Sequence, residues 1–397
     1  MGRADRPRGH SGRIALGLSL PLDRSGRGRG LSGVVVIGGG PAGAAAAITL
    51  ARAGARVTLV EREAGRREKV CGEFLGPDAA ALMEGLGLPL PELGAVPIRR
   101  GRLAAGARDA AWALPFPAWS LPRTVMDEAL LSAAAASGAV LLRGRAVAAA
   151  APEGDGWSLR FSDGATLRAA AVVLATGKHE LRGQARGVRG GSLGLKLPLR
   201  LAAPMEEAVV LLPFAGGYAG LQPRGGEGAG GEANLCAALH AAGPEARDAS
   251  ALLARVAAGS ALASGLLRGA EPLLDRPLAV AGVPYGFRHR DARAAPAGLY
   301  RVGDQFAVVP SLAGDGMAMA LAGGTATARA ILGGVPASEF HQVMDRRLDR
   351  PMRWAGFLAR LLEAAPRALT LAARVAPAAA RLAAARTRLV DAGGTFV

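Results

Sequence analysis

The sequence contains few of the residues that mark several common classes of protein. Among 397 residues, lysine occurs only at positions 69, 178 and 196, there are two cysteines, and aromatic residues make up 4%. The net charge of +16 therefore comes almost entirely from arginine spread along the chain, without the aromatic interleaving of a nucleic-acid surface. Two cysteines cannot build a disulfide framework, which favours a reducing compartment. We expect no nucleic-acid partner and a cytoplasmic location.

Metal-ligand spacing and long apolar runs are also missing. The five histidines are scattered, and none has a histidine or cysteine partner at a ligand spacing, so we expect no metal site. No stretch of about 18 apolar residues is free of charge and helix breakers, so we expect no transmembrane segment. The arginine-rich residues 1–31 lack the apolar core of a signal peptide. We interpret them as a disordered extension or a mis-assigned start.

A βαβ unit stands at the beginning of the remaining chain. Residues 34–37 are Val-Val-Val-Ile, a β-branched run typical of a strand that is buried on both faces of a parallel sheet. An alanine-rich helix is expected over about 41–53, and a second strand over 56–60 ends at Glu61. This order of elements predicts an α/β fold.

Three glycines and one acid in this unit form a phosphate-binding turn. Gly38 permits a sharp exit from the strand, Gly40 lets the backbone approach a pyrophosphate, and Gly43 allows the helix to pack closely on the strand. The helix N-terminus supplies free N–H groups for the diphosphate. Glu61 is placed to accept hydrogen bonds from ribose hydroxyls. An acid there disfavours a 2′-phosphate, so the turn suits FAD or NAD rather than NADP.

The rest of the chain shows further strands and helices. Buried strands are expected at 140–143, 171–175 and 299–302, and a hairpin at about 145–168. Short strands with one helical stretch near 245–268 fill most of 181–287. A helix over about 315–332, which Asp315 is placed to cap, precedes an alanine- and leucine-rich helical region that we expect to break at Pro366 and Pro377.

Several segments together resemble a known superfamily. The turn at 34–61, the Lys69–Glu73 loop, Arg123 with Asp127, and Gly303-Asp304 with 314–317 resemble the FAD-dependent oxidoreductases that include geranylgeranyl reductases and p-hydroxybenzoate-hydroxylase-type monooxygenases. The resemblance covers roughly residues 33–335. It is greatest to the geranylgeranyl-reductase-like branch, because of the segment 217–223 and the Asn-Leu pair that follows.

The resemblance implies roles for individual residues. Asp304 would hold the ribityl chain of FAD, and the helix after 310–317 would point its N-terminus at the flavin. Arg123 would lie near the cofactor, or would only form a surface ion pair with Asp127. Cys71 would approach the flavin as a redox-active thiol or as a small packing residue. The cofactor-contacting residues that we predict from the turn and the resemblance are Gly38, Gly40, Pro41, Ala42, Gly43, Glu61, Arg62, Lys69, Cys71, Gly72, Arg123, Val147, Gly303, Asp304, Gly314, Gly316 and Met317.

The resemblance also predicts the fold class and the domains. We expect a Rossmann-type FAD/NAD(P)-binding fold of the glutathione-reductase-like kind, with an inserted mixed-sheet substrate domain and C-terminal helices. The predicted domains are a disordered extension over 1–31, a discontinuous FAD-binding domain over 33–87, 123–180 and 288–335, a substrate-binding domain over 88–122 and 181–287, and a C-terminal helical segment over 336–397.

These features predict an FAD-dependent oxidoreductase, since the flavin carries the chemistry and the protein orients it. The first hypothesis is reduction or dehydrogenation of a C=C bond in an apolar isoprenoid- or polyketide-like substrate by hydride transfer at flavin N5. The alternative is a monooxygenase that hydroxylates an aromatic or polyketide substrate through a flavin C4a-hydroperoxide. A third hypothesis is a non-catalytic flavoprotein. NAD(P)H is considered as electron donor, although the stretch 175–179, Ala-Thr-Gly-Lys-His, lacks the family's Asp-Gly pair for NADPH.

The predicted substrate is small and largely apolar. Residues 208–214 and 278–285 offer aliphatic walls with very few ionisable groups, and the segment 88–122 is expected beside them. Tyr218 and Tyr285 are the hydroxyls expected to orient the substrate, unless they are core residues. The arginines at intervals in the C-terminal helices allow peripheral contact with a membrane, but packing over the cofactor domain is the favoured interpretation.

Overall fold

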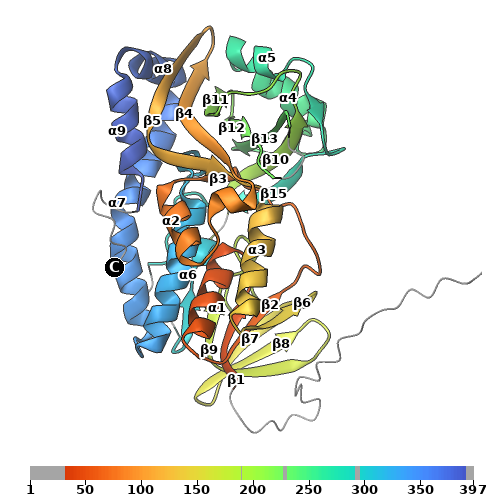
Figure 1. Cartoon of the computed structure of the whole chain (residues 1–397), viewed down its shortest axis with the longest axis vertical. Helices are drawn as coiled ribbons and strands as arrows, with labels where there is room; N and C mark the ends of the chain where they lie inside the picture. Colours follow the sequence, from red (N-terminus) through yellow and green to blue (C-terminus); the bar gives the residue numbers. More distant parts are fainter. Residues whose placement is uncertain (1–31, 189, 227–229, 291–295, 390–397) are drawn as a thin grey trace, which may run out of the picture.

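The computed structural model describes residues 32–188, 190–226, 230–290 and 296–389. The predicted disordered extension and the last residues of the predicted C-terminal segment lie outside these ranges. Two mixed sheets lie one beyond the other along the longest axis, and the last helices run along one side of both (Figure 1). The expected α/β class with a Rossmann-type sheet, a second mixed sheet and C-terminal helices is confirmed. The predicted domain boundaries stay a prediction.

The first sheet is built around a parallel core that contains the strand with the β-branched run. Its strands are β1 (Ser32–Ile37), β2 (Val57–Glu61), β6 (Val140–Arg143), β7 (Val147–Glu153), β8 (Gly156–Phe161), β9 (Thr166–Leu174) and β16 (Leu299–Arg301). The order β6-β2-β1-β9 is parallel, β16 pairs with β9 in the same direction, and β7 and β8 extend β9 as an antiparallel hairpin. The carboxyl ends of the parallel strands therefore share one edge.

Both faces of β1 are buried, as its composition predicts. Val34 and Val36 belong to a core shared with α1 (Pro41–Arg52), whereas Val35 and Ile37 pack on the other side with residues of β8 such as Leu159. The helix α1 is rich in alanine, and its small side chains let it pack closely against α6 (Gly316–Leu332) and α3 (Arg123–Ala136). The short α2 (Pro77–Gly85) completes this layer.

The second sheet has nine strands and is mainly antiparallel. Its members are β3 (Phe74–Leu75), β4 (Val96–Ala105), β5 (Arg108–Ser120), β10 (Ser192–Arg200), β11 (Ala208–Phe214), β12 (Gly217–Pro223), β13 (Glu232–Leu239), β14 (Glu271–Pro272) and β15 (Leu278–Val283). The order is β14-β10-β13-β12-β11-β4-β5-β3, and β15 pairs with β10. Among the described residues, 3₁₀ turns are formed by Leu90–Leu93, Pro244–Ala246, Gly303–Gln305 and Ser311–Ala313.

The single helical stretch expected near 245–268 is wrong, because the chain forms two helices there. They are α4 (Ala249–Ala257) and α5 (Ala261–Leu267), and both bury apolar residues against the second sheet. The break falls at Gly259 and Ser260. The Ser260 hydroxyl accepts a hydrogen bond from the Ala263 amide at 3.1 Å and so begins a new helix, a capping signal that the apolar pattern alone conceals.

Three helices end the described chain: α7 (Ala337–Ala364), α8 (Pro366–Val375) and α9 (Pro377–Arg386). Helices α8 and α9 begin at the two prolines where the sequence predicts interruptions. They pack against β5, and α8 also packs against β4, so they cover the second sheet, whereas α7 runs along the first (Figure 1). The favoured interpretation that these helices pack on the protein, rather than contact a membrane, stays a prediction.

Candidate functional site

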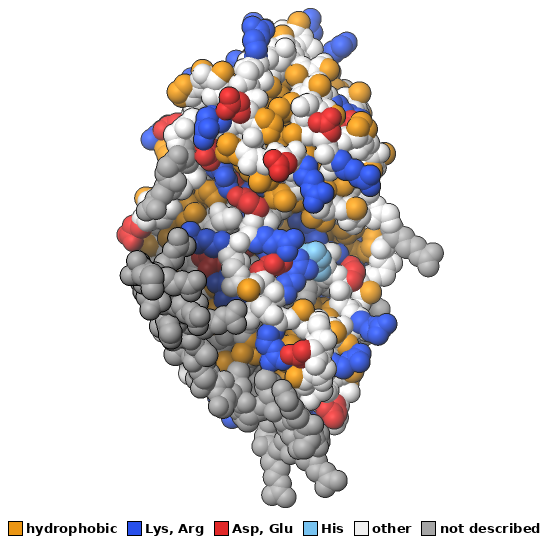
Figure 2. Space-filling model, turned by 90° about the vertical axis from the view of Figure 1, so that its right-hand side faces the viewer, with side chains coloured by type: hydrophobic (Ala, Val, Ile, Leu, Met, Phe, Trp, Pro, Cys, Tyr) orange, Lys and Arg blue, Asp and Glu red, His pale blue; other side chains and the backbone are white. Residues whose placement is uncertain are grey.

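A cavity of about 580 Å³ lies where the two sheets meet. Its walls come from the carboxyl edge of the first sheet, from β4, β5 and β12 of the second, and from the C-terminal helices. Figure 2 shows a hollow at mid-height, with lysine, arginine and histidine side chains gathered around it and a more apolar surface above. Positive charge at one end and apolar walls at the other suit a ligand with a charged and an apolar part.

The phosphate-binding turn has the geometry that its glycines predict. Gly38 has a φ of 108°, a left-handed conformation that a side chain would strain. A Cβ at Gly43 would clash with the carbonyl oxygen of Gly38, which explains the glycine at this helix–strand contact. A Cβ at Gly40 would meet only Arg123, at 3.7 Å, because it faces the cavity. Helix α1 begins at Pro41 with no side-chain cap, so its first N–H groups are available to a diphosphate.

Glu61 is held rigidly at the end of β2, where the sequence predicts a contact with ribose. One carboxylate oxygen accepts from the Gly39 amide at 2.8 Å, and the other accepts from the Glu63 amide at 2.9 Å. Each oxygen keeps a further lone pair for a ligand hydroxyl. Arg62 lies beside it, 2.7 Å from Nε2 of His179. The cavity is lined here by Glu61, Arg62 and Val147.

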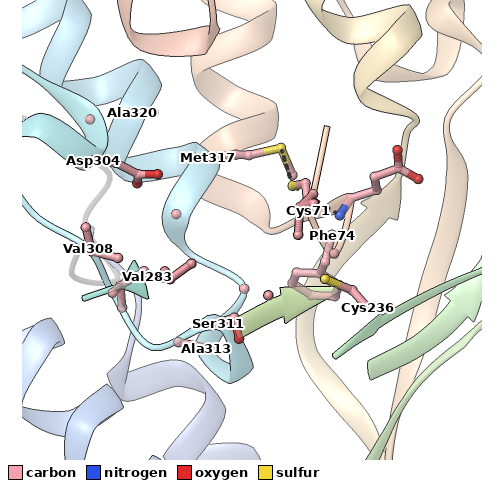
Figure 3. Close-up of a pocket in the computed structure, with 18 of the residues that line it drawn as sticks. Cys71, Phe74, Cys236, Val283, Asp304, Val308, Ser311, Ala313, Met317 and Ala320 are labelled. Carbon is pink, nitrogen blue, oxygen red and sulfur yellow. Dashed lines mark hydrogen bonds between the residues drawn. The ribbon is translucent and has the colours of Figure 1, made fainter. Parts of the chain in front are cut away.

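Asp304 lies just after the C-terminal end of β16, as the resemblance predicts. Its ion-pair partner, Lys178, was not predicted from the sequence. Its carboxylate is 3.1 Å from the Lys178 ammonium, and this neighbour holds the pKa of Lys178 above its usual value. Figure 3 shows Asp304 projecting toward the open space between Met317 and Val308. The sequence did hold a signal for this ion pair. Lys178 and Asp304 each follow a strand of the parallel sheet, and the carboxyl ends of parallel strands meet at one edge.

The loop of Cys71 and helix α6 face one another across the cavity. The thiol of Cys71 lies 3.8 Å from the sulfur of Met317 (Figure 3). The backbone carbonyls of Cys71 and Gly72 both accept hydrogen bonds from the side-chain amide of Asn234, at 3.0 and 2.9 Å. Cys236 lies on β13, the strand that also carries Asn234. Burial raises the pKa of its thiol to about 12, so the thiol stays protonated. This geometry is compatible with Cys71 as a redox-active thiol and with Cys71 as a small packing residue.

Arg123 forms the ion pair with Asp127 and also lies at the predicted cofactor site. It forms a two-pronged hydrogen-bonded ion pair with Asp127, at 2.7 and 2.8 Å, and it also lines the cavity. The pair is mostly buried, so it is not a surface ion pair. A guanidinium fixed in this way is a rigid positive charge beside the phosphate-binding turn.

A buried charge network ties the loop between β2 and β3 to the second sheet, and the sequence analysis missed it. Lys196 is completely buried in β10 and contacts the carboxylates of Glu73 and Glu68, while Arg224 contacts the same two acids. Glu73 has a φ of 62°, an uncommon conformation for a residue with a side chain. The available signal was a lone lysine in an otherwise apolar strand, since such a residue must find a partner.

The expected tyrosines meet in the apolar part of the cavity. The Tyr218 hydroxyl contacts the Ser311 hydroxyl and accepts a hydrogen bond from the Leu312 amide at 3.0 Å. Tyr285 lies beside the same serine. Burial raises the pKa of both phenols, so both keep their protons at neutral pH. Sequence reasoning missed Ser311, which gave no motif of its own.

The C-terminal helices form a wall of the cavity that the sequence analysis did not predict. Leu369 and Ala373 of α8 and Ala380 of α9 line it, together with Trp112 and Phe116 of β5, the strand on which these helices pack. These helices add to the walls that we expect from 88–122 and 181–287, residues of which also line the cavity. These helices consist mainly of leucine, alanine and arginine. This composition does not show whether a helix lines a cavity or packs on a surface.

Asp315 stands at the start of α6, but it does not cap the helix with its side chain, so that expectation is wrong. The carboxylate is buried and pairs instead with Arg388, whose guanidinium also donates to the Ala313 carbonyl at 2.7 Å. Burial raises the pKa of Asp315 to about 7, against the opposing effect of Arg388. The end of the C-terminal segment is thereby fastened to the turn that begins α6.

The predicted contacts can now be placed together. All of the predicted cofactor-contacting residues except Gly43 line the same cavity, and Gly43 has the packing role expected of it. Tyr218 and Tyr285 line it as well. The cavity-facing Gly40, the uncapped start of α1 and the carboxylate of Glu61 fit a dinucleotide with a diphosphate and a ribose.

Comparison with known families decides the cofactor. Residues 32–192 match the family described as FAD binding domain. This match places an FAD binding domain in that part of the chain. The FAD cofactor expected for this flavoprotein and its recognition as an FAD-dependent oxidoreductase are thereby confirmed.

Two curated relatives are similar over part of the flavoprotein. A menaquinone reductase from Mycolicibacterium smegmatis is 34% identical over 161 residues, which cover 39% of each chain. A 6-methylpretetramide 4-monooxygenase from Streptomyces rimosus is 49% identical over 55 residues, which cover 14% of this chain and 13% of that one. The flavoprotein therefore spans well under half the length of the relatives it matches.

Solved structures share the fold over nearly the whole length. A flavin-dependent brominase is 17% identical with a TM-score of 0.73, covering 91% of this chain and 94% of its own. A geranylgeranyl bacteriochlorophyll reductase-like protein from Thermoplasma acidophilum is 18% identical with a TM-score of 0.67, covering 86% and 89%. The resemblance to geranylgeranyl-reductase-like proteins is confirmed as a likeness of fold.

Metal ions and membranes are partners of other kinds. Within the residues that the structure describes, no group of three or more His, Cys, Asp or Glu side chains is arranged to hold a metal ion. In the same residues no single helix is long and apolar enough to cross a membrane. The bent pair Pro366–Val375 and Pro377–Arg386 passes the test of length and composition only when the two helices are taken together.

Proposed function

We propose that the flavoprotein reduces a C=C bond of an apolar isoprenoid- or polyketide-like substrate. The observation that carries this proposal is the continuity of a single cavity. One end collects the predicted FAD contacts around Gly40 and Asp304, and the other is walled by aliphatic and aromatic side chains with the hydroxyls of Tyr218 and Tyr285 among them. Apolar walls bind by buried area, at about 25 cal/mol per Å², and a few polar groups set the orientation.

The relatives support an oxidoreductase with a large organic substrate, and they leave two reactions in competition. The longer match is named a menaquinone reductase, which favours reduction. The shorter and more similar match is named a 6-methylpretetramide 4-monooxygenase, which favours hydroxylation of a polyketide-like substrate as the alternative. A cytoplasmic location and the choice of NAD(P)H as electron donor stay predictions.

The residues that would hold FAD follow from the site. The amides at the start of α1 and the turn from Gly38 to Ala42 would bind the diphosphate, and Glu61 would accept hydrogen bonds from the adenosine ribose. Asp304, with Lys178 beside it, would hold the ribityl chain. When bound, FAD supplies the hydride of the reduction. The helix α6, which begins at Gly316, places its N-terminal dipole beside this region.

Reduction of a C=C bond also needs a proton on the second carbon, and the flavoprotein offers hydroxyls for it. The phenols of Tyr218 and Tyr285 are protonated because burial raises their pKa. The Leu312 amide and the Ser311 hydroxyl fix the Tyr218 oxygen in place. A positioned hydroxyl in a water-poor cavity is suited to general acid catalysis.

The test uses purified FAD-loaded protein, reduced without oxygen and mixed with a quinone that carries an unsaturated prenyl chain. The organic product is then extracted in air, which returns any quinol to quinone. We expect a product that has gained two hydrogen atoms in the chain, measured by mass spectrometry, and no change when the chain of the quinone is already saturated. A product that gains one oxygen atom from labelled O₂ in the aerobic reaction would instead establish the monooxygenase.

The hydroxyls give a sharper prediction. Tyr218→Phe and Tyr285→Phe should each slow formation of the saturated product by tenfold or more, because a positioned acid contributes about 10²–10⁴ in rate. Tyr300→Phe is the matched control, since the Tyr300 hydroxyl donates to the Val335 carbonyl at 2.7 Å and does not line the cavity. FAD content, measured by absorbance, should be equal in all variants. Equal rates in the four proteins would remove the tyrosines from the reaction.

A further inference from the structure

The outer side of α8 and α9 is unusually apolar for a surface. The exposed fractions of Leu371, Val375 and Leu382 are 43%, 76% and 55%. Four of the seven large apolar side chains that are exposed in the described part of the chain lie between residues 357 and 382, because Phe357 on α7 is the fourth. A cluster of this kind on one side of a molecule marks a site of contact with another apolar phase.

The same two helices carry positive charge with no acid among them. Arg367, Arg374, Arg381 and Arg386 are all exposed, and residues 364–389 contain no aspartate or glutamate. Arg386 stacks over the Trp354 ring, 5.4 Å from its centre. We call these four arginines, together with Leu371, Val375 and Leu382, the α8–α9 surface.

The α8–α9 surface and the cavity lie on opposite sides of a single layer of helix. Leu369 and Ala373 face inward and line the cavity, whereas Leu371 and Val375 on the same helix face outward. On α9, Ala380 and Ala384 line the cavity and Leu382 is exposed. The wall of the apolar end of the cavity is therefore also the apolar and arginine-rich outside of the molecule.

We propose that the α8–α9 surface docks on a bilayer that contains anionic phospholipids, with both helices lying in the plane of the interface. Each helix has ten residues and is about 15 Å long, half of the roughly 30 Å of a hydrocarbon core, and the two are bent by 111°. Leucine and valine side chains that enter the acyl boundary, with arginines at the level of the phosphates, are the pattern of an interfacial helix.

Charge argues against a second copy of the chain as the occupant. A two-fold contact would place the α8–α9 surface of one molecule against the same surface of the other, and so bring together two sets of four arginines without a carboxylate in 364–389. Anionic headgroups neutralise the same arginines. The proposal is independent of the reaction in the cavity, because it depends only on the outside of the helices.

The test is co-sedimentation of the full FAD-loaded chain with vesicles of phosphatidylcholine alone or with a third of phosphatidylglycerol, at two salt concentrations. We expect binding to the anionic vesicles, weaker binding at high salt, and little binding to phosphatidylcholine. Arg374→Glu with Arg381→Glu should lower the partition coefficient at least tenfold. Leu371→Ser with Val375→Ser should lower it at both salt concentrations. The matched control is Arg200→Glu with Arg276→Glu, the same change of charge at two exposed arginines on the second sheet and its connections.

Folding is checked by FAD content and circular dichroism, which should not change in any of these variants. Equal binding of the wild type and both α8–α9 variants, or equal loss of binding in the Arg200 and Arg276 control, would overturn the proposal. So would a lack of binding to anionic vesicles. Sedimentation velocity without lipid tests whether a second copy of the chain occupies the surface instead. A wild-type dimer that becomes monomeric in the variant Leu371→Ser with Val375→Ser would assign the surface to a second copy.

Discussion

At the scale of single residues, Asp304 is the side chain whose placement the sequence predicted and whose surroundings it did not. The carboxylate sits at the end of β16, as expected, but it is also paired with Lys178 at 3.1 Å. The contribution of Asp304 to cofactor binding therefore has two parts: its own hydrogen bonds and the position it gives to the lysine.

Asp304→Ala should weaken FAD binding by about 1.5–3 kcal/mol, the usual value of a hydrogen bond to a charged group, which corresponds to roughly ten- to a hundredfold in Kd. The measurement is titration of the FAD-free protein by flavin fluorescence. Lys178→Met measures the contribution of the lysine alone, because this variant keeps the carboxylate of Asp304. Asp155→Ala, at the exposed turn between β7 and β8, is the control. An unchanged Kd for Asp304→Ala would place this carboxylate outside the cofactor site.

At the scale of elements, helix α7 is fixed to the first sheet by one histidine. His341 is completely buried, and its Nε2 accepts a hydrogen bond from the Arg301 amide of β16 at 2.9 Å. Only the neutral ring can accept this bond. Burial, with His289 and Arg301 nearby, lowers the pKa of His341 to about 3.

This histidine predicts a loss of stability in mild acid. Below pH 6.5 the unfolded chain takes up a proton at His341, whereas the folded protein takes it up only near pH 3, so the free energy of unfolding falls as the pH falls through this range. At pH 5 the loss should be about 2 kcal/mol relative to pH 7.5. Urea unfolding at both pH values measures it. His341→Gln keeps an acceptor and should reduce the difference by that amount, whereas His240→Gln, at an exposed site, should not. An equal pH difference in wild type and His341→Gln would contradict the assignment.

The elements also show what the sequence could predict and why the rest escaped it. Local signals were sufficient for the turn at Gly38 and Gly43, for Glu61, and for the helix breaks at Pro366 and Pro377, because each depends on residues close in the chain. The ion pair of Lys178 with Asp304, the network of Lys196, and the closing of the cavity by α8 join segments far apart. Their partners are set by the packing of two sheets, which no spacing in the sequence records.

At the scale of the whole molecule, the buried charges around Lys196 fasten the loop that leads out of the first sheet to the second sheet. Lys196→Met should lower the free energy of unfolding by about 3–5 kcal/mol, because Glu68 and Glu73 lose their shared partner. Lys196→Met with Glu73→Gln should recover part of the loss, since it removes one of the stranded charges. Urea unfolding at neutral pH measures both. A single variant as stable as the wild type would show that Arg224 alone balances the two acids.

The cavity is lined by residues that lie far apart in the sequence, and this has a consequence for synthesis. The turn at Gly38 leaves the ribosome before Asp304 and α6, and the wall with Leu369 and Ala380 follows them. Domains fold as units, with the N-terminal part first. A nascent chain thus has a diphosphate-binding turn long before it has an enclosed cavity, because the apolar end stays open until α8 and α9 pack on β5.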